Sequence, residues 1–370
     1  MLCPRLLVAT ALTTLLAVAP ASAADLSPAD RAFVDDTIAQ AMQDGRLPGV
    51  SVSISGPKGS YERAYGLGDT ATSAPLKVDD HVRIASITKT FTATAVLQQV
   101  QRGRLKLSDK LARWVRGVPN GRRITIRQLL AMRSGIYDFT SDPAFNRRFN
   151  ADPLMSFRPR DILPIIRRHE PLFAPGARTS YADSNYVLLG MILERLTGRS
   201  ARSLITRGII RPAGLRGTSF PRTPAMPAPF AHGYFAGPDG DGELRDYTEV
   251  NPAVAWTAGA MISTLADLRT WGRELATGTL LDRRLQRERL RFGALPNPGG
   301  PSVGYGLGIM HVGDWIGHNG AIFGFSTVTF YEPASGAQIV AAANLSSNFS
   351  TPTLGIFFQL AQHLYPETLR

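Results

Sequence analysis

A serine and a lysine three residues apart are the pair in this sequence best suited to do chemistry. A short apolar approach leads into Ser86, and residues 86–97 then follow a helical pattern that ends near Gly103. Residues three apart share one helical face, so Lys89 brings its amine beside the Ser86 hydroxyl. A neighbouring amine held neutral can activate a serine, which is otherwise a weak nucleophile. The pair predicts acyl transfer through a covalent serine intermediate. A capping serine beside a solvated lysine is the ordinary alternative.

Composition and charge limit the other kinds of chemistry. The chain has 370 residues, of which 44% are hydrophobic, enough for one large domain or two lobes. Its one cysteine, Cys3, lies near the start, so disulfides, thiol catalysis and cysteine-ligated metals are excluded from the rest. The net charge is +12, but the arginines are scattered and form no nucleic-acid motif. We expect no nucleic-acid partner. If the charge has a specific binding role, attraction to an acidic envelope polymer is favoured. The ordinary interpretation is a solvated basic surface without a specific partner.

The N-terminal stretch has the pattern of a secretory signal. Arg5 supplies the positive end, residues 6–18 the apolar segment, and Ala21-Ser22-Ala23 the small-residue cleavage site. We expect residues 1–23 to be removed and residues 24–370 to form a single domain. The apolar segment is short for a bilayer, and no other stretch approaches the roughly 20 apolar residues of a spanning helix. The sequence therefore predicts a periplasmic or secreted protein without an integral membrane segment after signal removal.

Predicted strands lie at both ends of the chain and predicted helices lie between them. Alternating or β-branched residues predict strands at 49–55, 61–67, 325–331 and 338–343. Helical patterns cover residues 27–44, 125–130, 159–168, 186–196, 264–275 and 353–364. Residues 221–242 read as an irregular connection that could shape a cleft. The pattern predicts one mixed sheet in a lobe of about residues 24–104 and 251–370, with a helical lobe at about 105–250 inserted.

Two further motifs follow Ser86 and Lys89 in a known order. Tyr181-Ala182-Asp183 precedes a predicted helix, and His318-Asn319-Gly320 precedes a predicted strand. Alone, they read as a packing tyrosine and a tight turn. With Ser86-Ile87-Thr88-Lys89, they resemble the three motifs of the serine β-lactamase and penicillin-binding-protein superfamily. The resemblance is to the branch with class C β-lactamases, D-alanyl-D-alanine carboxypeptidases and related esterases. Other stretches typical of that branch are residues 105–109, 124–130, 134–135, 186–190, 258–264 and 305–308.

The resemblance implies a fold and a set of roles. The fold would be α/β (α+β), with a mixed, mainly antiparallel sheet flanked by helices and an inserted helical lobe. Ser86 would form the acyl-enzyme, and Lys89 and Tyr181 would share proton transfer, either being the base. The backbone N–H groups of Ser86 and Ala321 would form the oxyanion hole. His318 would line the opposite wall and donate to Tyr181 or to a substrate carboxylate. The implied substrate-binding residues are Asp183, His318, Asn319, Gly320, Ala321 and, as an aromatic cleft wall, Trp256.

Three positions depart from the pattern of the resembling proteins. Asp183 stands where asparagine is usual, and an ionised carboxylate cannot donate to substrate and favours the ammonium form of Lys89. Carboxypeptidase-like members also carry a basic residue and a hydroxyl where this chain has Met310 and Ala321. We interpret Asp183 as a change of substrate or rate. The other two changes weaken the case for recognition of a terminal carboxylate.

The expected function is an exported serine hydrolase, D-alanyl-D-alanine carboxypeptidase-like, acting on cell-wall peptides. An esterase, a D-aminopeptidase, a β-lactamase and a non-catalytic binder of cell-wall peptide stay open, because the motifs encode acyl transfer and not the leaving group. A Ser-His-Asp hydrolase is less favoured. The six histidines are dispersed and no phosphate-binding loop is evident, so we expect no metal and no cofactor. The expected partner is a peptide or small acyl substrate, with peptidoglycan as its candidate source.

Overall fold

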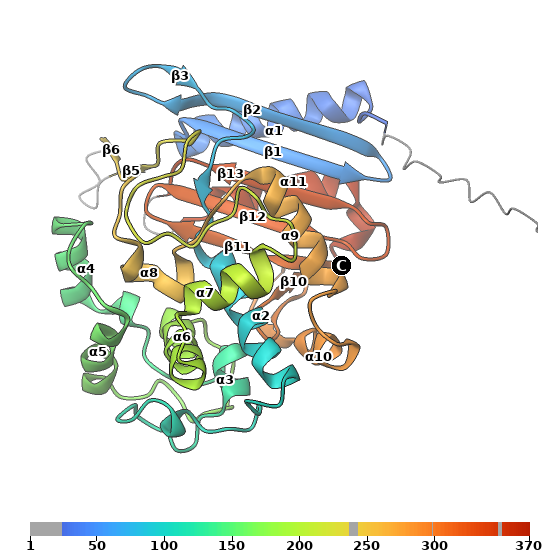
Figure 1. Ribbon diagram of the computed structural model, residues 1–370. Coiled ribbons are helices and arrows are strands. Elements are labelled where there is room, and N and C mark those ends of the chain that lie inside the picture. Colours follow the sequence, from blue (N-terminus) through green and yellow to red (C-terminus); the bar gives the residue numbers. More distant parts are fainter. Residues whose placement is uncertain (1–23, 237–242, 298, 347–349) are drawn as a thin grey trace, which may run out of the picture.

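One antiparallel sheet forms the centre of the molecule, and both ends of the chain contribute to it (Figure 1). The computed structural model describes residues 24–236, 243–297, 299–346 and 350–370, so the predicted signal at 1–23 lies outside the described residues. Nine strands run in the order β3-β2-β1-β13-β12-β11-β10-β9-β8. Their bounds are β1 Gly49–Gly56, β2 Gly59–Asp69, β3 Ala74–Pro75, β8 Gly293–Leu295, β9 Val303–Tyr305, β10 Met310–Val312, β11 Trp315–Ile322, β12 Phe325–Tyr331 and β13 Gln338–Ala343.

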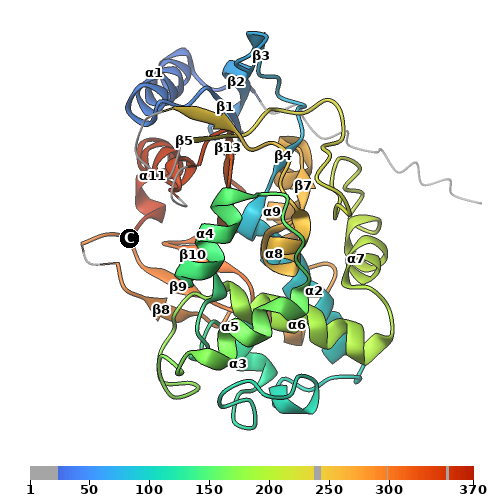
Figure 2. The same cartoon turned by 90° about the vertical axis from the view of Figure 1, so that its left-hand side faces the viewer.

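Helices cover both faces of this sheet. α1 (Pro28–Gly45) and α11 (Pro352–Leu364) lie side by side on one face, and α9 (Leu265–Thr277) packs on the other (Figures 1 and 2). Strand β1 was expected to be half-buried because valine and isoleucine alternate with serine. Both of its faces are covered instead, since Ser51 and Ser53 are as buried as Val50 and Val52. Short polar side chains fit there because the α9 face packs close to the sheet.

Helix α2 (Thr88–Gln101) is the axis of the helical side of the molecule. Its residues are buried almost without interruption from Thr88 to Gln99, so it is packed all round and has no solvent stripe. The remaining helices are α3 Ile126–Leu130, α4 Pro143–Ala151, α5 Ile162–Arg168, α6 Asp183–Thr197, α7 Ala201–Ile205, α8 Pro252–Gly259 and α10 Arg283–Arg289. Of these, α6, α7 and α8 contact α2 directly. Within the described ranges, no helix has the length and hydropathy needed to cross a bilayer.

Two short strand pairs complete the fold. β4 (Val82–Arg83) pairs with β7 (Ile262–Ser263), and β5 (Tyr234–Ala236) pairs with β6 (Leu244–Asp246). Strand β4 leads into the turn that carries Ser86, and its partner β7 leads into α9. The sheet, the helical side and the antiparallel pairing agree with the fold class expected from the sequence.

The predicted elements were found, with differences at two motifs. His318-Asn319-Gly320 does not form a tight turn but lies inside β11, paired with β12. Helix α6 begins at Asp183 and not near Tyr186, so the second motif ends on the first residue of a helix. Helices α4, α7, α8 and α10 and strands β3–β10 were not predicted. They are short, so few positions are available to show a helical or alternating period.

Trp271 joins α9 to α2 and generates a stability prediction. It is 1% exposed, stacks on Phe91 at 4.0 Å between centroids, and donates from Nε1 to Thr90 Oγ1 at 2.7 Å. Trp271→Ala should lower the free energy of unfolding by about 3–5 kcal/mol because it leaves a large cavity. Trp271→Phe keeps the stacking and should cost much less, about 1 kcal/mol for the lost hydrogen bond. Urea unfolding of both variants measures this, and equal losses would contradict it.

Candidate active site

Ser86 sits in a tight turn that opens directly into α2. The 3-10 turn Ala85–Ile87 precedes the helix, and Ala85 has a left-handed backbone with φ of 47°. Hydrogen bonds with the main chain of Met261 hold both sides of this turn. Ile84 N–H donates to the Met261 carbonyl at 2.9 Å, and Met261 N–H donates to the Thr88 hydroxyl at 3.0 Å. An unusual backbone held from both sides fixes the direction of the Ser86 side chain.

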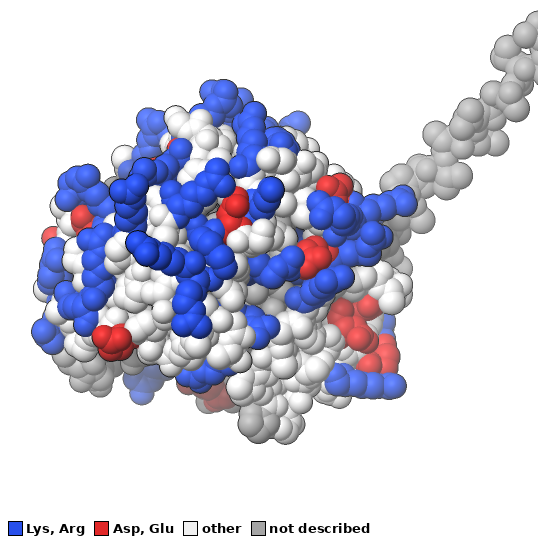
Figure 3. All heavy atoms as spheres, turned by 90° about the horizontal axis from the view of Figure 1, so that it is seen from below, with Lys and Arg blue, Asp and Glu red and all other residues white. Residues whose placement is uncertain are grey.

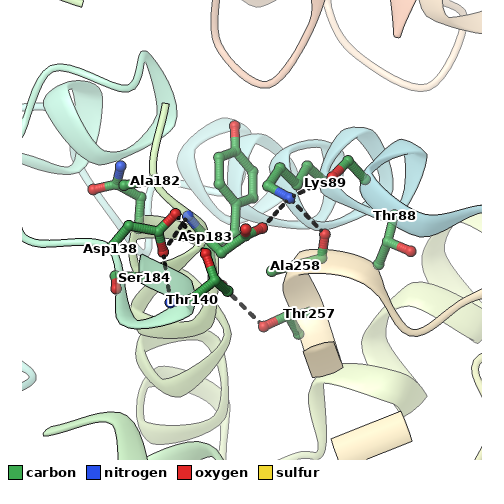
Figure 4. Close-up of polar contacts among 12 residues, drawn as sticks. Thr88, Lys89, Asp138, Thr140, Ala182, Asp183, Ser184, Thr257 and Ala258 are labelled. Carbon is green, nitrogen blue, oxygen red and sulfur yellow. Dashed lines mark hydrogen bonds and ion pairs between the residues drawn. The ribbon is translucent and has the colours of Figure 1, made fainter. Parts of the chain in front are cut away.

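The Lys89 amine is the centre of the candidate site. The side chain is fully buried, and Nζ donates to Ser86 Oγ at 2.9 Å, to Asp183 Oδ1 at 2.5 Å and to the Ala258 carbonyl at 2.8 Å. Figure 4 shows Lys89 reaching toward Asp183 and Ala258. An ammonium has three donors, and all three find acceptors here. The predicted proximity of Ser86 and Lys89 is therefore present, and it includes an ion pair with Asp183.

A kink in α8 supplies one of these acceptors. Trp256 has φ of 37° and ψ of −123°, which interrupts the helix. The Thr257 carbonyl accepts from the Thr92 hydroxyl at 2.7 Å, and the Ala258 carbonyl accepts from Lys89. Trp256 was expected to line the cleft, but its side chain borders two other depressions, beside Pro159 and Glu194. Its backbone shapes the site and its ring lies elsewhere.

Tyr181 stands at the mouth of the site, against Ser86. The residue keeps 39% of its surface exposed, while its phenol interacts with the Ser86 hydroxyl and lies near Asp183. Burial of the phenol and the negative charge of Asp183 hold the Tyr181 pKa well above its usual value. The phenol is therefore protonated at neutral pH. The Lys89 ammonium lies 4.9 Å from the centre of the Tyr181 ring.

His318 lies behind the wall of the site and not on it. It is 1% exposed; Nδ1 donates to the Asn319 carbonyl at 2.5 Å and Nε2 accepts from the Tyr305 hydroxyl at 3.1 Å. Burial lowers the His318 pKa to about 3, so the ring is neutral at physiological pH. The expectation that His318 lines the wall and donates to Tyr181 or to a carboxylate does not match this placement. Asn319, Gly320 and Ala321 do line the site.

Gly320 lets strand β11 touch the turn that carries Ser86. A Cβ atom at this position would lie 2.5 Å from the Ile84 carbonyl oxygen and 2.9 Å from the Ala85 side chain. Those distances are closer than packed carbon atoms tolerate, so only glycine allows this approach. The next residue, Ala321, borders the same cavity as Ser86.

A cavity of about 420 Å³ opens in front of Ser86. Its walls are largely apolar, and Phe149 lies 4.5 Å from Phe323 between ring centres. Two carboxylates, Asp138 and Asp183, also line it, and no lysine, arginine or histidine is among its described lining residues. The other lining residues are Ala85, Thr140, Phe145, Asn146, Tyr181, Val250, Asn251, Val254, Ala255, Ala258, Gly259, Met310, Asn319, Gly320, Ala321, Ile322 and Thr351.

Ion pairs and buried polar contacts hold the segments around this cavity. Asp142 caps α4 by accepting from Phe145 N–H at 2.8 Å, and it pairs with Arg168 at 2.6 Å. Hydrogen bonds from Arg168 and His169 hold the Asp142 pKa below its usual value against the opposing effect of burial. Buried Arg83 donates to the Thr248 carbonyl and fixes the chain that leads to the cavity wall.

Sequence reasoning missed Asp138 and the aromatic wall. Phe145 and Phe149 lie on α4, which was not predicted, and Phe149 meets Phe323 only in the folded chain. Asp138 follows the Ser134-Gly135 stretch closely, and this was the one available signal.

A second serine pattern is not part of the site. Residues 300–304 read Gly-Pro-Ser-Val-Gly, the spacing of a nucleophile elbow, but Ser302 is exposed and contacts the Arg370 carbonyl at 3.4 Å. It does not line the cavity. In the part of the chain that the structure describes, no group of three or more His, Cys, Asp or Glu side chains could hold a metal ion.

The family follows from comparison with known proteins. The Beta-lactamase family model matches residues 34–357, which is most of the chain. The chain belongs to the beta-lactamase family. This membership confirms the superfamily resemblance and the fold class expected from the sequence, and it places the chain among serine hydrolases.

Relatives of this beta-lactamase family member include several with D-amino acid chemistry in their names. A D-stereospecific amidohydrolase from Streptomyces sp. is 32% identical, with a TM-score of 0.81 over 90% of this chain and 98% of that one. D-amino acid amidase from Ochrobactrum anthropi SV3, complexed with L-phenylalanine amide, is 26% identical, with a TM-score of 0.78 over 92% and 98%. Protein flp of Staphylococcus aureus (strain N315) is 28% identical over 85% of this chain, which spans 63% of that relative's length.

Removal of the candidate nucleophile gives the first test of the site. Ser86→Ala should abolish labelling by a fluorophosphonate probe, because Ser86 is the one serine among the described residues that line the cavity and its hydroxyl contacts a buried amine. Ser302→Ala is the matched control, since it removes the serine of the other motif, and its labelling should equal that of the unchanged chain. Gel fluorescence and mass spectrometry of the labelled peptide measure this. Labelling that survives Ser86→Ala would contradict the assignment.

The carboxylate of the second motif gives another test. Asp183→Asn removes the ion pair with Lys89, while the amide oxygen can still accept from Nζ. The rate of Ser86 acylation by a penicillin-like or fluorophosphonate probe should stay the same or rise, because the amide nitrogen, unlike a carboxylate, can donate to the acyl donor. Asp152→Asn, an exposed change of the same kind, should have no effect. A large fall in the rate with Asp183→Asn alone would show that the carboxylate has its own catalytic task.

Proposed function

We propose that this chain is an exported serine hydrolase that cleaves amides or peptides of D-amino acids through an acyl-enzyme on Ser86. One observation carries the proposal: Ser86 and Tyr181 meet at a largely apolar cavity, with Lys89 buried behind Ser86. The described residues that line this cavity include two carboxylates and no lysine, arginine or histidine. Such a cavity suits an acyl group with an apolar side chain and a neutral leaving group, and it disfavours an anionic one.

The proposed reaction uses the contacts around Ser86. Lys89 first passes a proton from Nζ to Asp183 Oδ1, which lies 2.5 Å away. The Ser86 oxygen then bonds to the substrate carbonyl carbon while its proton passes to the neutral Lys89 amine, 2.9 Å away. The tetrahedral intermediate then loses the amine, whose nitrogen takes a proton from the Tyr181 phenol, kept protonated by its raised pKa. Tyr181 regains its proton from Lys89. Water hydrolyses the ester, releasing the D-amino acid and restoring Ser86.

The oxyanion of this intermediate would lie between the Ser86 turn and β11. Ser86 and Ala321 both border the cavity, and Gly320 brings their backbones together. In the proposed mechanism their two N–H groups donate to the oxyanion. Such donors are each worth several kcal/mol of transition-state stabilisation in serine hydrolases.

The carboxypeptidase activity expected from the sequence stays a prediction, and the site gives it less support. A D-alanyl-D-alanine substrate ends in a carboxylate, which needs a fixed cation or several donors. Met310 and Ala321 provide neither through their side chains, and His318 is neutral and buried. The D-aminopeptidase alternative fits better, and the names of the amidohydrolase and amidase relatives support the same substrate class.

The place of action is also a proposal. The pattern of residues 1–23 supports export, and a D-amino acid substrate fits the cell envelope. Figure 3 shows lysine and arginine side chains spread over the face seen from below, with few acidic ones between them. With a net charge of +12, this surface supports attraction to an acidic envelope polymer.

Substrate comparison tests the proposed function. We expect kcat/KM for D-phenylalaninamide to exceed that for L-phenylalaninamide, and that for a peptide ending in D-alanyl-D-alanine, by at least about tenfold, or about 1.4 kcal/mol of transition-state discrimination. Ser86→Ala should abolish all turnover. Liquid chromatography of the released amino acid measures each rate. Faster release of terminal D-alanine would restore the carboxypeptidase assignment. Turnover of p-nitrophenyl acetate alone would indicate an esterase, and the absence of any Ser86-dependent reaction a binder.

A further inference from the structure

A second carboxylate faces the candidate substrate cavity and has no cationic partner. Asp138 lines the cavity next to Asp183, and Figure 4 shows the two side chains adjacent, with Lys89 on the other side of Asp183. Asp183 is paired with Lys89 at 2.5 Å. No lysine, arginine or histidine of the described residues lies within ion-pair distance of Asp138, so its charge is not neutralised by the protein.

Neutral donors position this carboxylate. Asp138 Oδ1 accepts from Asp183 N–H at 3.1 Å and from Thr140 N–H at 3.3 Å, and Oδ2 accepts from the Thr140 hydroxyl at 2.9 Å. The carboxylate is thus fixed in orientation against the start of α6. Each oxygen of a carboxylate can accept more than one bond, so Oδ2, with one donor, keeps capacity for a ligand.

The electrostatic surroundings favour a bound cation. Burial and the negative charge of Asp183 raise the Asp138 pKa to about 7. A positively charged group at Oδ2 would offset both effects, since it stabilises the ionised form of a partly buried carboxylate. The cavity therefore offers an anionic contact, an apolar wall at Phe145, Phe149 and Phe323, and the Ser86 nucleophile.

We propose that Asp138 binds the α-ammonium group of the substrate and makes the site selective for acyl donors with a free amino end. The α-amino nitrogen is separated from the reacting carbonyl by a single carbon atom, so its partner must border the same cavity as Ser86, as Asp138 does. The inference rests on the proposed function, of which it names the substrate class. Carbonyl, ammonium and side chain would each have a separate contact. Three such contacts at one α-carbon distinguish its two mirror images.

A paired-substrate experiment isolates the ammonium contact. The probes are the p-nitrophenyl ester of D-phenylalanine and its N-acetyl derivative, which differ only in the charge and bulk at the α-nitrogen. Asp138→Asn keeps the acceptor oxygen for Asp183 and Thr140 N–H and removes the charge. We expect kcat/KM for the free-amino ester to fall about tenfold to hundredfold, mainly through KM, because a hydrogen bond to a charged group is lost. The value for the N-acetyl ester should stay within about twofold.

A matched control uses a similar aspartate away from the cavity. Asp152 accepts from Leu154 N–H two residues ahead, as Asp138 does from Thr140, but it is exposed and does not line the cavity. Asp152→Asn should leave both esters unchanged. Equal losses with both esters in Asp138→Asn would make Asp138 a structural cap and overturn the proposal. An unchanged ratio of the two rates would also overturn it.

The pH profile adds a readout that a structural cap would not move. The titratable groups that face Asp138 are Asp183, Tyr181 and Tyr137. The contact needs ionised Asp138, whose pKa is raised to about 7, and a protonated α-amino group, which loses its proton at about pH 8. The rate with the free-amino ester should therefore rise up to about pH 7 and fall above about pH 8, and Asp138→Asn should remove the rising step. The N-acetyl ester should lack this step in both proteins. A step that persists in Asp138→Asn would contradict the assignment.

The two proposals can fail separately. The esters are activated, so they report the ammonium contact even if the protein cleaves no amide. A chain that hydrolyses the esters with an Asp138-dependent preference but leaves D-phenylalaninamide intact would overturn the proposed function and keep this inference. Amide hydrolysis with no Asp138-dependent preference would support the proposed function and overturn this inference.

Discussion

A fully buried ammonium group is the constraint on which the rest of this structure depends. Charge removed from water is tolerated only where its donors all find acceptors, and the acceptors of Lys89 come from three separate parts of the chain. Ser86 lies one turn away, Asp183 opens α6, and Ala258 is the residue before the last in the kinked helix α8. Segments separated by up to 169 positions must therefore meet at one atom. The packing of α6 and α8 around α2 meets this requirement.

Main chain and side chains have different tasks around this centre. Backbone contacts of β4, β7 and β11 hold the turn that carries Ser86, and they involve few side chains that could vary. The cavity wall, by contrast, is built from the side chains of α4 and the residue Phe323. In the proposed mechanism, the sheet and α2 position the reactive groups, and α4 at the edge of the cavity contacts the acyl side chain of the substrate.

The sequence allowed much of the fold and the chemical centre to be predicted. Ser86, Lys89, Tyr181 and Asp183 were found because their spacing is local or matches an ordered set of motifs. His318 was placed wrongly because its role depends on burial behind Tyr305, which no local pattern encodes. Trp256 was expected in the cleft from its resemblance to an aromatic wall residue of the carboxypeptidases, yet its side chain borders two other depressions. Asp138 and the α4 aromatics become neighbours only through tertiary packing.

The kink of α8 has a consequence for how this protein can change over time. Two of the three groups that bind the buried amine are side chains, and an amino-acid substitution at either alters or deletes the contact. The third is the Ala258 carbonyl, which every amino acid carries. A substitution at Ala258 therefore keeps a carbonyl group for the amine, whereas a substitution at Asp183 changes the carboxylate contact. Asp183 is also the position at which the second motif departs from the common pattern.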